Sequence, residues 1–168
     1  AESEEERWNL VLDNIEGFAG EKLSVLEEVY TSEYETSWSN RAIANLLVAE
    51  GADVAICARH AEEVEKAVAE LSQSGKAIGA AVDVADKAAL QSWVTGAAEE
   101  LGGIDILVPN VSAGGGQMDE NGWRANLEVD ILGTTHAIEA AMPSLQASGA
   151  GSIVVIGTTA AVEDFLGP

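Results

Sequence analysis

The 168-residue sequence is poor in cysteine, proline and basic side chains. Its one cysteine, Cys57, excludes an internal disulfide, which fits a reducing compartment such as the cytoplasm. Lysine and arginine total 8 against 29 acidic residues, so the formal net charge is −21. A surface this acidic repels phosphate backbones and anionic lipids, so we expect neither nucleic acid nor membrane as a partner. No apolar run approaches the roughly 18 residues of a transmembrane helix, and the acidic amino terminus does not resemble a secretory signal.

The composition itself, 47% hydrophobic and 22% charged, is that of a globular chain. The acidic residues are unevenly spread, because residues 1–40 hold 11 of them with only 2 basic residues. This change in composition places a boundary near Asn40. We therefore expect an acidic amino-terminal segment, residues 1–40, followed by a domain over residues 41–168.

Residues 41–168 alternate between helical and strand patterns. Short apolar runs predict strands, and amphipathic stretches predict helices, one of which Asp86 can cap. The longest helix has a stripe that we expect to face the core: Trp123, Leu127, Ile131, Thr134, Ile138 and Met142. Apolar strands that alternate with helices favour an α/β fold with a doubly wound, Rossmann-like parallel sheet, here incomplete. The expected strands are 53–58, 77–82, 104–108 and 152–157, and the expected helices are 41–50, 61–74, 87–101 and 121–146.

Residues 1–40 show a different pattern. Apolar residues from Trp8 to Phe18 recur at helical spacing, and a second apolar stretch covers residues 23–30. For this second stretch we favour helix over strand, because Glu27 and Glu28 would be costly in a buried central strand. The segment is therefore expected to form one or two acidic amphipathic helices.

Residues 41–168 contain five short strings in a recognisable order: RAIANLLVAEGADVAICAR, VDVAD, GGIDILVPNVS, DILGTTHAIEAAMP and GSIVVIGTTAAV. In order and spacing they resemble the classical short-chain dehydrogenase/reductase family, with most similarity to the 3-oxoacyl-carrier-protein reductase-like members. The match runs over residues 41–168, about three quarters of the chain. The resemblance implies an oxidoreductase that transfers hydride between a nicotinamide cofactor and a small carbonyl or alcohol substrate.

The resemblance assigns cofactor contacts to the first three strings. Asp83, with Val84 beside it, matches the position whose carboxylate accepts a hydrogen bond from the adenine amino group. Arg59 stands where a guanidinium suits the 2′-phosphate of NADP, so the family implies NADP, or else NAD. The plainer alternatives are a helix-capping or loop aspartate for Asp83 and a solvated arginine for Arg59.

The rest of the pattern supplies two further cofactor-binding residues, Asn110 and Gly114, and two catalytic positions. Asn110 matches the second Asn of an Asn-Asn-Ala-Gly turn, and Gly114 follows in a glycine-rich loop beside the expected nicotinamide. Thr158 stands at the position of the catalytic serine, and Asp130 at that of an asparagine that supports a proton-relay water. The alternatives are a mobile loop for Gly114 and a residue at the edge of a helix stripe for Asp130.

Two parts of the family pattern are missing from the sequence. The family's Thr-Gly-x-x-x-Gly-Ile-Gly phosphate loop requires glycine at positions 34, 38 and 40, but these are Tyr34, Trp38 and Asn40. Glycine lets backbone amides approach the pyrophosphate, so we expect no tight dinucleotide binding. The general-acid tyrosine and its lysine, Tyr-x-x-x-Lys, do not occur in the sequence either. The chain is therefore expected to be a truncated, inactive oxidoreductase domain.

The alternative from another class is a non-catalytic interaction protein that uses residues 1–40 to bind a partner. Neither His60 nor His136 has metal-ligand spacing with other residues, so no metal site is expected. Whether the chain forms a homo-oligomer is left open. Because the family's central first strand has no clear counterpart, we also expect loose packing, with neighbouring strands left unpaired.

Overall fold

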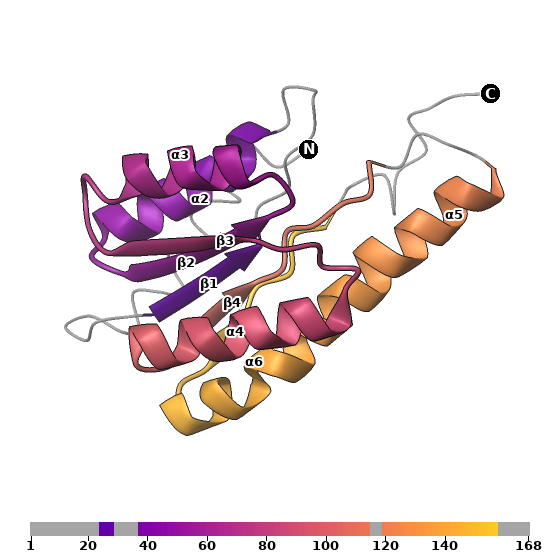
Figure 1. The fold of residues 1–168 in the computed structure, drawn as a ribbon. Coiled ribbons are helices and arrows are strands. Elements are labelled where there is room, and N and C mark those ends of the chain that lie inside the picture. The colour runs from indigo at the N-terminus through magenta and orange to yellow at the C-terminus, as the bar shows by residue number, and fades with distance from the viewer. Residues whose placement is uncertain (1–23, 29–36, 115–118, 158–168) are drawn as a thin grey trace, which may run out of the picture.

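The computed structural model describes residues 24–28, 37–114 and 119–157. They form a parallel sheet with helices on both faces (Figure 1). The strands are β1 (Ser24–Glu28), β2 (Asp53–Ala58), β3 (Ala77–Ala81), β4 (Ile106–Val108) and β5 (Ser152–Ile153). The helices are α2 (Ser37–Ala49), α3 (Ala61–Leu71), α4 (Lys87–Leu101), α5 (Glu120–Asn126), η2 (Leu127–Gly133) and α6 (Thr134–Ser148).

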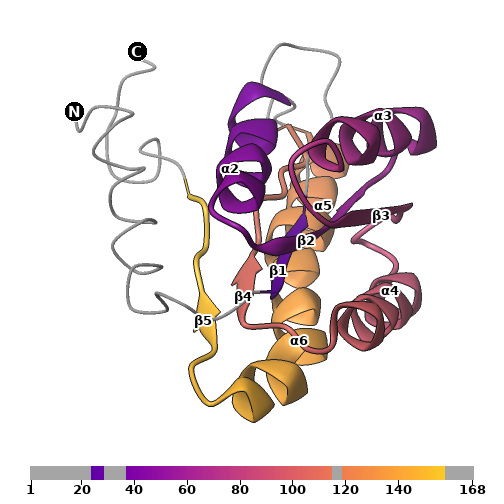
Figure 2. The same cartoon turned by 90° about the vertical axis from the view of Figure 1, so that its left-hand side faces the viewer.

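The strand order is β3-β2-β1-β4-β5, and every pair is parallel. The chain first builds outward from β1 to β3 and then crosses to β4 on the other side of β1. Helices α2 and α3 cover one face of the sheet, whereas α4 and α6 cover the other (Figure 2). The doubly wound, Rossmann-like α/β class expected from the sequence is confirmed. In such sheets, ligands bind at the carboxyl ends of the strands beside the crossover, here between β1 and β4.

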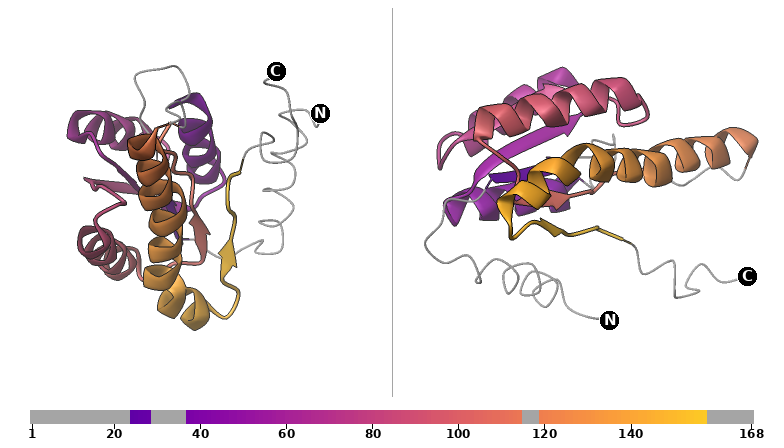
Figure 3. Two further views of the ribbon diagram at one scale, coloured as in Figure 1. Left: turned by 90° about the vertical axis from the view of Figure 1, so that its right-hand side faces the viewer. Right: turned by 90° about the horizontal axis from the view of Figure 1, so that it is seen from below.

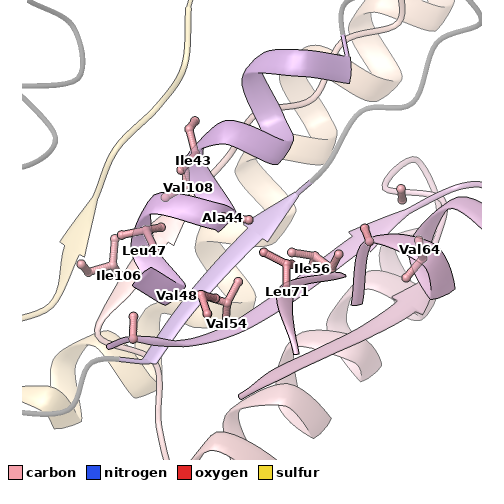
Figure 4. Packing of buried hydrophobic residues seen from close by; sticks show 13 residues of the cluster. Ile43, Ala44, Leu47, Val48, Val54, Ile56, Val64, Leu71, Ile106 and Val108 are labelled. Carbon is pink, nitrogen blue, oxygen red and sulfur yellow. The ribbon is translucent and has the colours of Figure 1, made fainter. Parts of the chain in front are cut away.

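Two hydrophobic cores lie on opposite faces of the sheet, and alternate residues of β2 supply both. Val54 and Ile56 pack beneath α2 and α3, as Figure 4 shows, whereas Ala55 and Cys57 belong to the core under α4 and α6. All six residues of β2 are buried. A strand buried on both faces must be apolar throughout rather than alternating, which is why the run DVAICA predicts it so well.

Both ends of α4 are set by residues that the sequence identifies as helix caps. The Asp86 side chain caps α4 by accepting from the backbone N–H groups of Ala88 and Ala89, at 3.0 and 3.1 Å. Gly102 ends the same helix in the left-handed conformation, with φ +87°. The predicted ranges of β2 and α4 match the structure residue for residue.

The expectation of a helix over residues 23–30 is wrong, because β1 occupies Ser24–Glu28 at the centre of the sheet. Val25 pairs with Val54 of β2 and Ile106 of β4, and Leu26 pairs with Ala55 and Leu107. The physical reason lies in position along the strand. Glu27 and Glu28 are the last two residues of β1, where the sheet meets its loops, so the apolar pair Val25-Leu26 takes the middle. The expected gap between β2 and β4 is therefore filled, and both strands are paired along β1.

The expected inward stripe of the long helix is also wrong at its first three positions. Trp123, Leu127 and Ile131 are 64%, 53% and 57% exposed. The buried row consists mostly of small residues instead: Gly133, Ala137, Ala141 and Leu145. Small side chains let α6 pack closely on the sheet and α4, whereas a pattern weighted by hydrophobicity selects the large residues of another face.

Helix α5 extends beyond the sheet, as Figures 1 and 3 show, and none of its residues is buried. The three helical segments α5, η2 and α6 follow one another without a break from Glu120 to Ser148. Their middle segment, η2, is a π-helix. Its backbone hydrogen bonds join residues five apart, whereas those of the α-helices on either side join residues four apart.

The change in composition near Asn40 is not a break in the structure, because α2 runs across it from Ser37 to Ala49. The expected helices of residues 8–18 lie outside the described residues. In the described part of the chain, no helix combines the length and apolar character needed to cross a lipid bilayer.

Candidate functional site at the carboxyl edge of the sheet

The predicted cofactor residues follow the carboxyl ends of three strands of the same parallel sheet, β2, β3 and β4. Arg59 comes directly after β2, Asp83 two residues after β3, and Asn110 two residues after β4. The hydrogen bonding between β2 and β3 continues one residue beyond the end of β3, because the Val82 N–H donates to the carbonyl of Ala58 at 2.8 Å. This bond places the residues after β2 and β3 side by side at one edge of the sheet.

Asp83 is exposed, and its carboxylate already has a structural role. Its Oδ1 accepts from the backbone N–H of Ala85 at 3.0 Å, and its carbonyl accepts from the N–H of Asp86. The side chain therefore closes a tight turn just before α4, which agrees with the loop role among the alternatives for Asp83, whereas Asp86 caps the helix. Capping through one oxygen and recognition of an adenine are compatible, since a carboxylate has several acceptor sites.

The loop after β4 is built from short polar contacts. Asn110 and Ser112 are half-buried, and the Ser112 hydroxyl accepts from the N–H of Gly114 at 3.1 Å. Gly114 has φ +86°, a conformation that side chains with a Cβ rarely adopt. The family's turn has glycine at the Ser112 position, so the serine that departs from the pattern takes part in the turn here. The remaining glycines of this loop lie outside the described residues.

Asp130 holds that loop from the long helix. Its Oδ1 accepts from the backbone N–H of Ala113 at 2.7 Å, a contact between η2 and the segment after β4. A short bond from an N–H to a charged acceptor is among the stronger hydrogen bonds in proteins. The structure thus brings Asp130 to the loop of Asn110 and Gly114, whereas Thr158, its expected catalytic partner, lies outside the described residues.

Glu27 and Glu28 of β1 end at the same edge, between the loops of β2 and β4. The sequence prediction did not place them there, because it assigned a helix to residues 23–30. The sequence does contain a signal for this strand, the run SVLEE. Its apolar residues come first and its two glutamates last, as in a strand whose end leads into an exposed loop. β1 therefore ends in two acidic residues at the edge of the sheet where the chain crosses over.

A separate groove of about 860 Å³ lies at the opposite, amino edge of the sheet, between the carboxyl halves of α4 and α6. Asp105 lines it and accepts from the Ser24 N–H at 2.9 Å and from the Ser148 hydroxyl at 2.6 Å. None of the predicted site residues lines this groove. Within the described residues, no group of three His, Cys, Asp or Glu side chains could hold a metal ion.

Comparison with known proteins agrees with this arrangement of elements. The family model described as short chain dehydrogenase matches residues 40–167. Isoepoxydon dehydrogenase patN of Penicillium expansum is 32% identical over 125 residues, which are 71% of this chain and 48% of that protein. The chain spans about half the length of several curated relatives that it matches.

Two solved structures share the fold at low sequence identity. An NAD⁺-bound xylitol dehydrogenase has a TM-score of 0.72 and 21% identity, covering 84% of this chain and 55% of its own. An alcohol dehydrogenase from Thermococcus sibiricus, complexed with 5-hydroxy-NADP, has a TM-score of 0.73 and 22% identity, covering 84% and 61%. The family match over residues 40–167 is decisive, and this chain belongs to the short-chain dehydrogenase family.

Proposed function

We propose that the chain carries the framework of a nicotinamide-dependent oxidoreductase for small carbonyl or alcohol substrates. We further propose that these 168 residues alone neither bind the dinucleotide tightly nor transfer hydride. Family membership supports the first part, and fold relatives that hold NAD⁺ or 5-hydroxy-NADP support a nicotinamide cofactor. The second part rests on how the residues at the carboxyl edge fit such a cofactor.

The adenine side of the site fits. Arg59 and the Asp83 turn lie side by side after β2 and β3, so a guanidinium and a carboxylate flank the place of an adenosine. Ala58 brings no acidic group to the position where NAD-preferring family members bind the ribose hydroxyls, so we propose NADP rather than NAD. Asn110 and Gly114, in the loop after β4, would lie beside the nicotinamide, with Asp130 and Thr158 in the catalytic roles.

The pyrophosphate side does not fit. β1 ends in Glu27-Glu28, and the segment that joins it to α2 contains Glu33 and Glu35. No glycine occurs between residues 20 and 51, so backbone amides cannot approach a pyrophosphate as they do in a glycine-rich loop. This absence of glycine beside four acidic residues is the single observation that carries the proposal. Losing several charge-assisted hydrogen bonds, each worth about 1.5–3 kcal/mol, removes micromolar affinity.

Isothermal titration calorimetry with NADPH and NADH tests the proposal. The unmodified chain is expected to give no micromolar isotherm with either dinucleotide. A loop variant, Tyr34→Gly with Trp38→Gly and Asn40→Gly, restores the family's glycines and should bind measurably better. A clear micromolar isotherm from the unmodified chain would overturn the proposal, because another loop would then hold the pyrophosphate.

A non-catalytic interaction protein is the second candidate. The exposed row of Trp123, Leu127 and Ile131 favours it, because contiguous exposed apolar residues mark interaction surfaces. Residues 24–28 are part of the central sheet, so that part of residues 1–40 is not a free docking arm. Failure of the glycine-restored variant to bind either dinucleotide would favour this candidate.

A further inference from the structure

The π-helical segment η2 contacts two separate loops at the carboxyl edge. Asp130 accepts a hydrogen bond from Ala113 in the loop after β4. Three residues later, Gly133 lies against Val84 in the turn after β3. About one turn of helix therefore lies between the loop of the adenine-side residues and the loop of the nicotinamide-side residues.

The contact between Gly133 and Val84 is too close for an unstrained side chain. A Cβ added to Gly133 would lie 3.0 Å from Cγ2 and 3.3 Å from Cβ of Val84, both tighter than ordinary contacts, and 3.5 Å from its carbonyl oxygen. The backbone of Gly133 has φ −56° and ψ −52°, ordinary helical values that any residue adopts. Glycine is therefore favoured here by space rather than by conformation.

Val84 cannot easily move away from an added side chain. It is 7% exposed and belongs to the core under α4 and α6. The nearest atom is Cγ2, and because Val84 is buried it has little space into which Cγ2 can turn. The turn is therefore expected to shift by a few tenths of an ångström, and with it the Asp83 carboxylate bonded to Ala85.

We propose that Gly133 is a positioning residue that lets η2 fix the Asp83 turn relative to the Ala113 loop. It acts through Val84 and touches neither cofactor nor substrate. The positioning of the turn rests on the contacts of Gly133 with Val84 and of Asp130 with Ala113. The effect of that positioning on an adenosine ligand rests on the proposed function. In this arrangement η2 sets the distance between the two halves of the site.

The test compares Gly133→Ala with Gly96→Ala in the full chain. Gly96 lies within α4, and a Cβ there would meet nothing within 4 Å, so it is a matched helical control. Gly96→Ala is expected to raise the unfolding temperature through helix propensity, whereas Gly133→Ala lowers it. In Gly133→Ala, amide exchange at Ala85 should accelerate by roughly tenfold, and the Val84 methyl resonances should shift.

Rescue separates positioning from a general loss of stability. Val84→Ala removes the atom nearest to the added Cβ, so Gly133→Ala with Val84→Ala should recover most of the exchange protection at Ala85. Wild-type exchange rates at Ala85 and Ala113 in Gly133→Ala would overturn the proposal. Failure of the double variant to recover protection would also overturn it.

Titration with adenosine 2′-phosphate distinguishes this inference from the proposed function. The probe lacks a pyrophosphate, so it reports on Arg59 and the Asp83 turn without the missing glycine loop. If wild-type resonances of Val84 and Ala85 shift on titration and the shifts weaken in Gly133→Ala, both proposals gain support. If the probe never binds but the exchange and rescue results hold, the proposed function fails while the positioning role stands.

Discussion

Arg59 is the residue whose chemistry bears most directly on cofactor choice. It follows β2 at the carboxyl edge, beside the turn that holds Asp83. A guanidinium binds a phosphate through parallel, charge-assisted hydrogen bonds, which the ribose hydroxyl of NADH cannot match. The position therefore predicts discrimination between the two dinucleotides even where total affinity is low.

We expect the glycine-restored variant to bind NADPH roughly tenfold or more tightly than NADH, as the loss of one charge-assisted contact implies. Arg59→Ala in that background should remove the difference. Lys66→Ala, which deletes an exposed positive charge on α3 instead, is the control for net charge. Equal affinity for both dinucleotides before mutation would leave Arg59 as an ordinary surface residue.

At the scale of elements, β1 decides whether the sheet exists as one unit. It bonds to β2 on one side and β4 on the other, so it is the only link between them in the described sheet. Proline cannot donate to a ladder and is excluded from central strands.

Leu26→Pro is therefore expected to abolish cooperative unfolding, as measured by near-ultraviolet circular dichroism during a thermal melt. Ala61→Pro is the matched control. Ala61 is the first residue of α3, where proline is tolerated, and the preceding His60 already has the extended backbone that proline requires. A sharp melt for Leu26→Pro would mean that β1 contributes little to the sheet.

The pair of helices α4 and α6 is joined by an exposed ion pair, with Lys87 Nζ 2.8 Å from Glu139 Oε2. The hydrogen bond from Lys87, together with its charge, holds the pKa of Glu139 below its ordinary value. A carboxyl whose pKa is lowered by folding stabilises the folded state above its unfolded pKa. That contribution is lost as the pH falls through the lowered folded pKa.

We expect Glu139→Gln to lower the unfolding temperature slightly near neutral pH, with the difference from wild type vanishing in acid. The effect is small because both side chains are exposed. Glu120→Gln is the control, since Glu120 pairs with Arg124 within one helix and joins no two elements. A difference that grows as the pH falls would contradict the assigned direction.

The whole molecule carries a net charge of −21 on 168 residues. Charge of one sign at this density destabilises the compact state through self-repulsion, which salt screens over a Debye length of about 10 Å at 0.1 M.

Raising the salt concentration from about 0.01 to 0.15 M should therefore raise the unfolding temperature, as calorimetry would show. Sodium and potassium chloride should act equally, because screening does not depend on which cation is present. An unfolding temperature that falls with salt would mean that attractive ion pairs outweigh the repulsion.

Local patterns in the sequence determined most of the framework. The apolar run of β2 is enough to predict a strand buried on both faces. The residues Asp86 and Gly102, which cap the two ends of α4, are enough to predict the bounds of that helix. The positions of Arg59, Asp83 and Asn110 after successive strands follow from the same alternation. The family resemblance over residues 41–168 rests on the same strings, and the family match over residues 40–167 confirms it.

Only the tertiary structure decided the role of β1 and the buried face of the long helix. Glu27 and Glu28 argue against a strand until its two partners show that they stand at its end. Trp123 and Leu127 are more hydrophobic than Gly133 and Ala137, yet the small residues are buried because α6 packs closely on its neighbours. The contacts of Asp130 with Ala113 and of Gly133 with Val84 also join segments distant in sequence. Sequence periodicity reports local preference, whereas register, close packing and contacts between loops depend on which elements become neighbours.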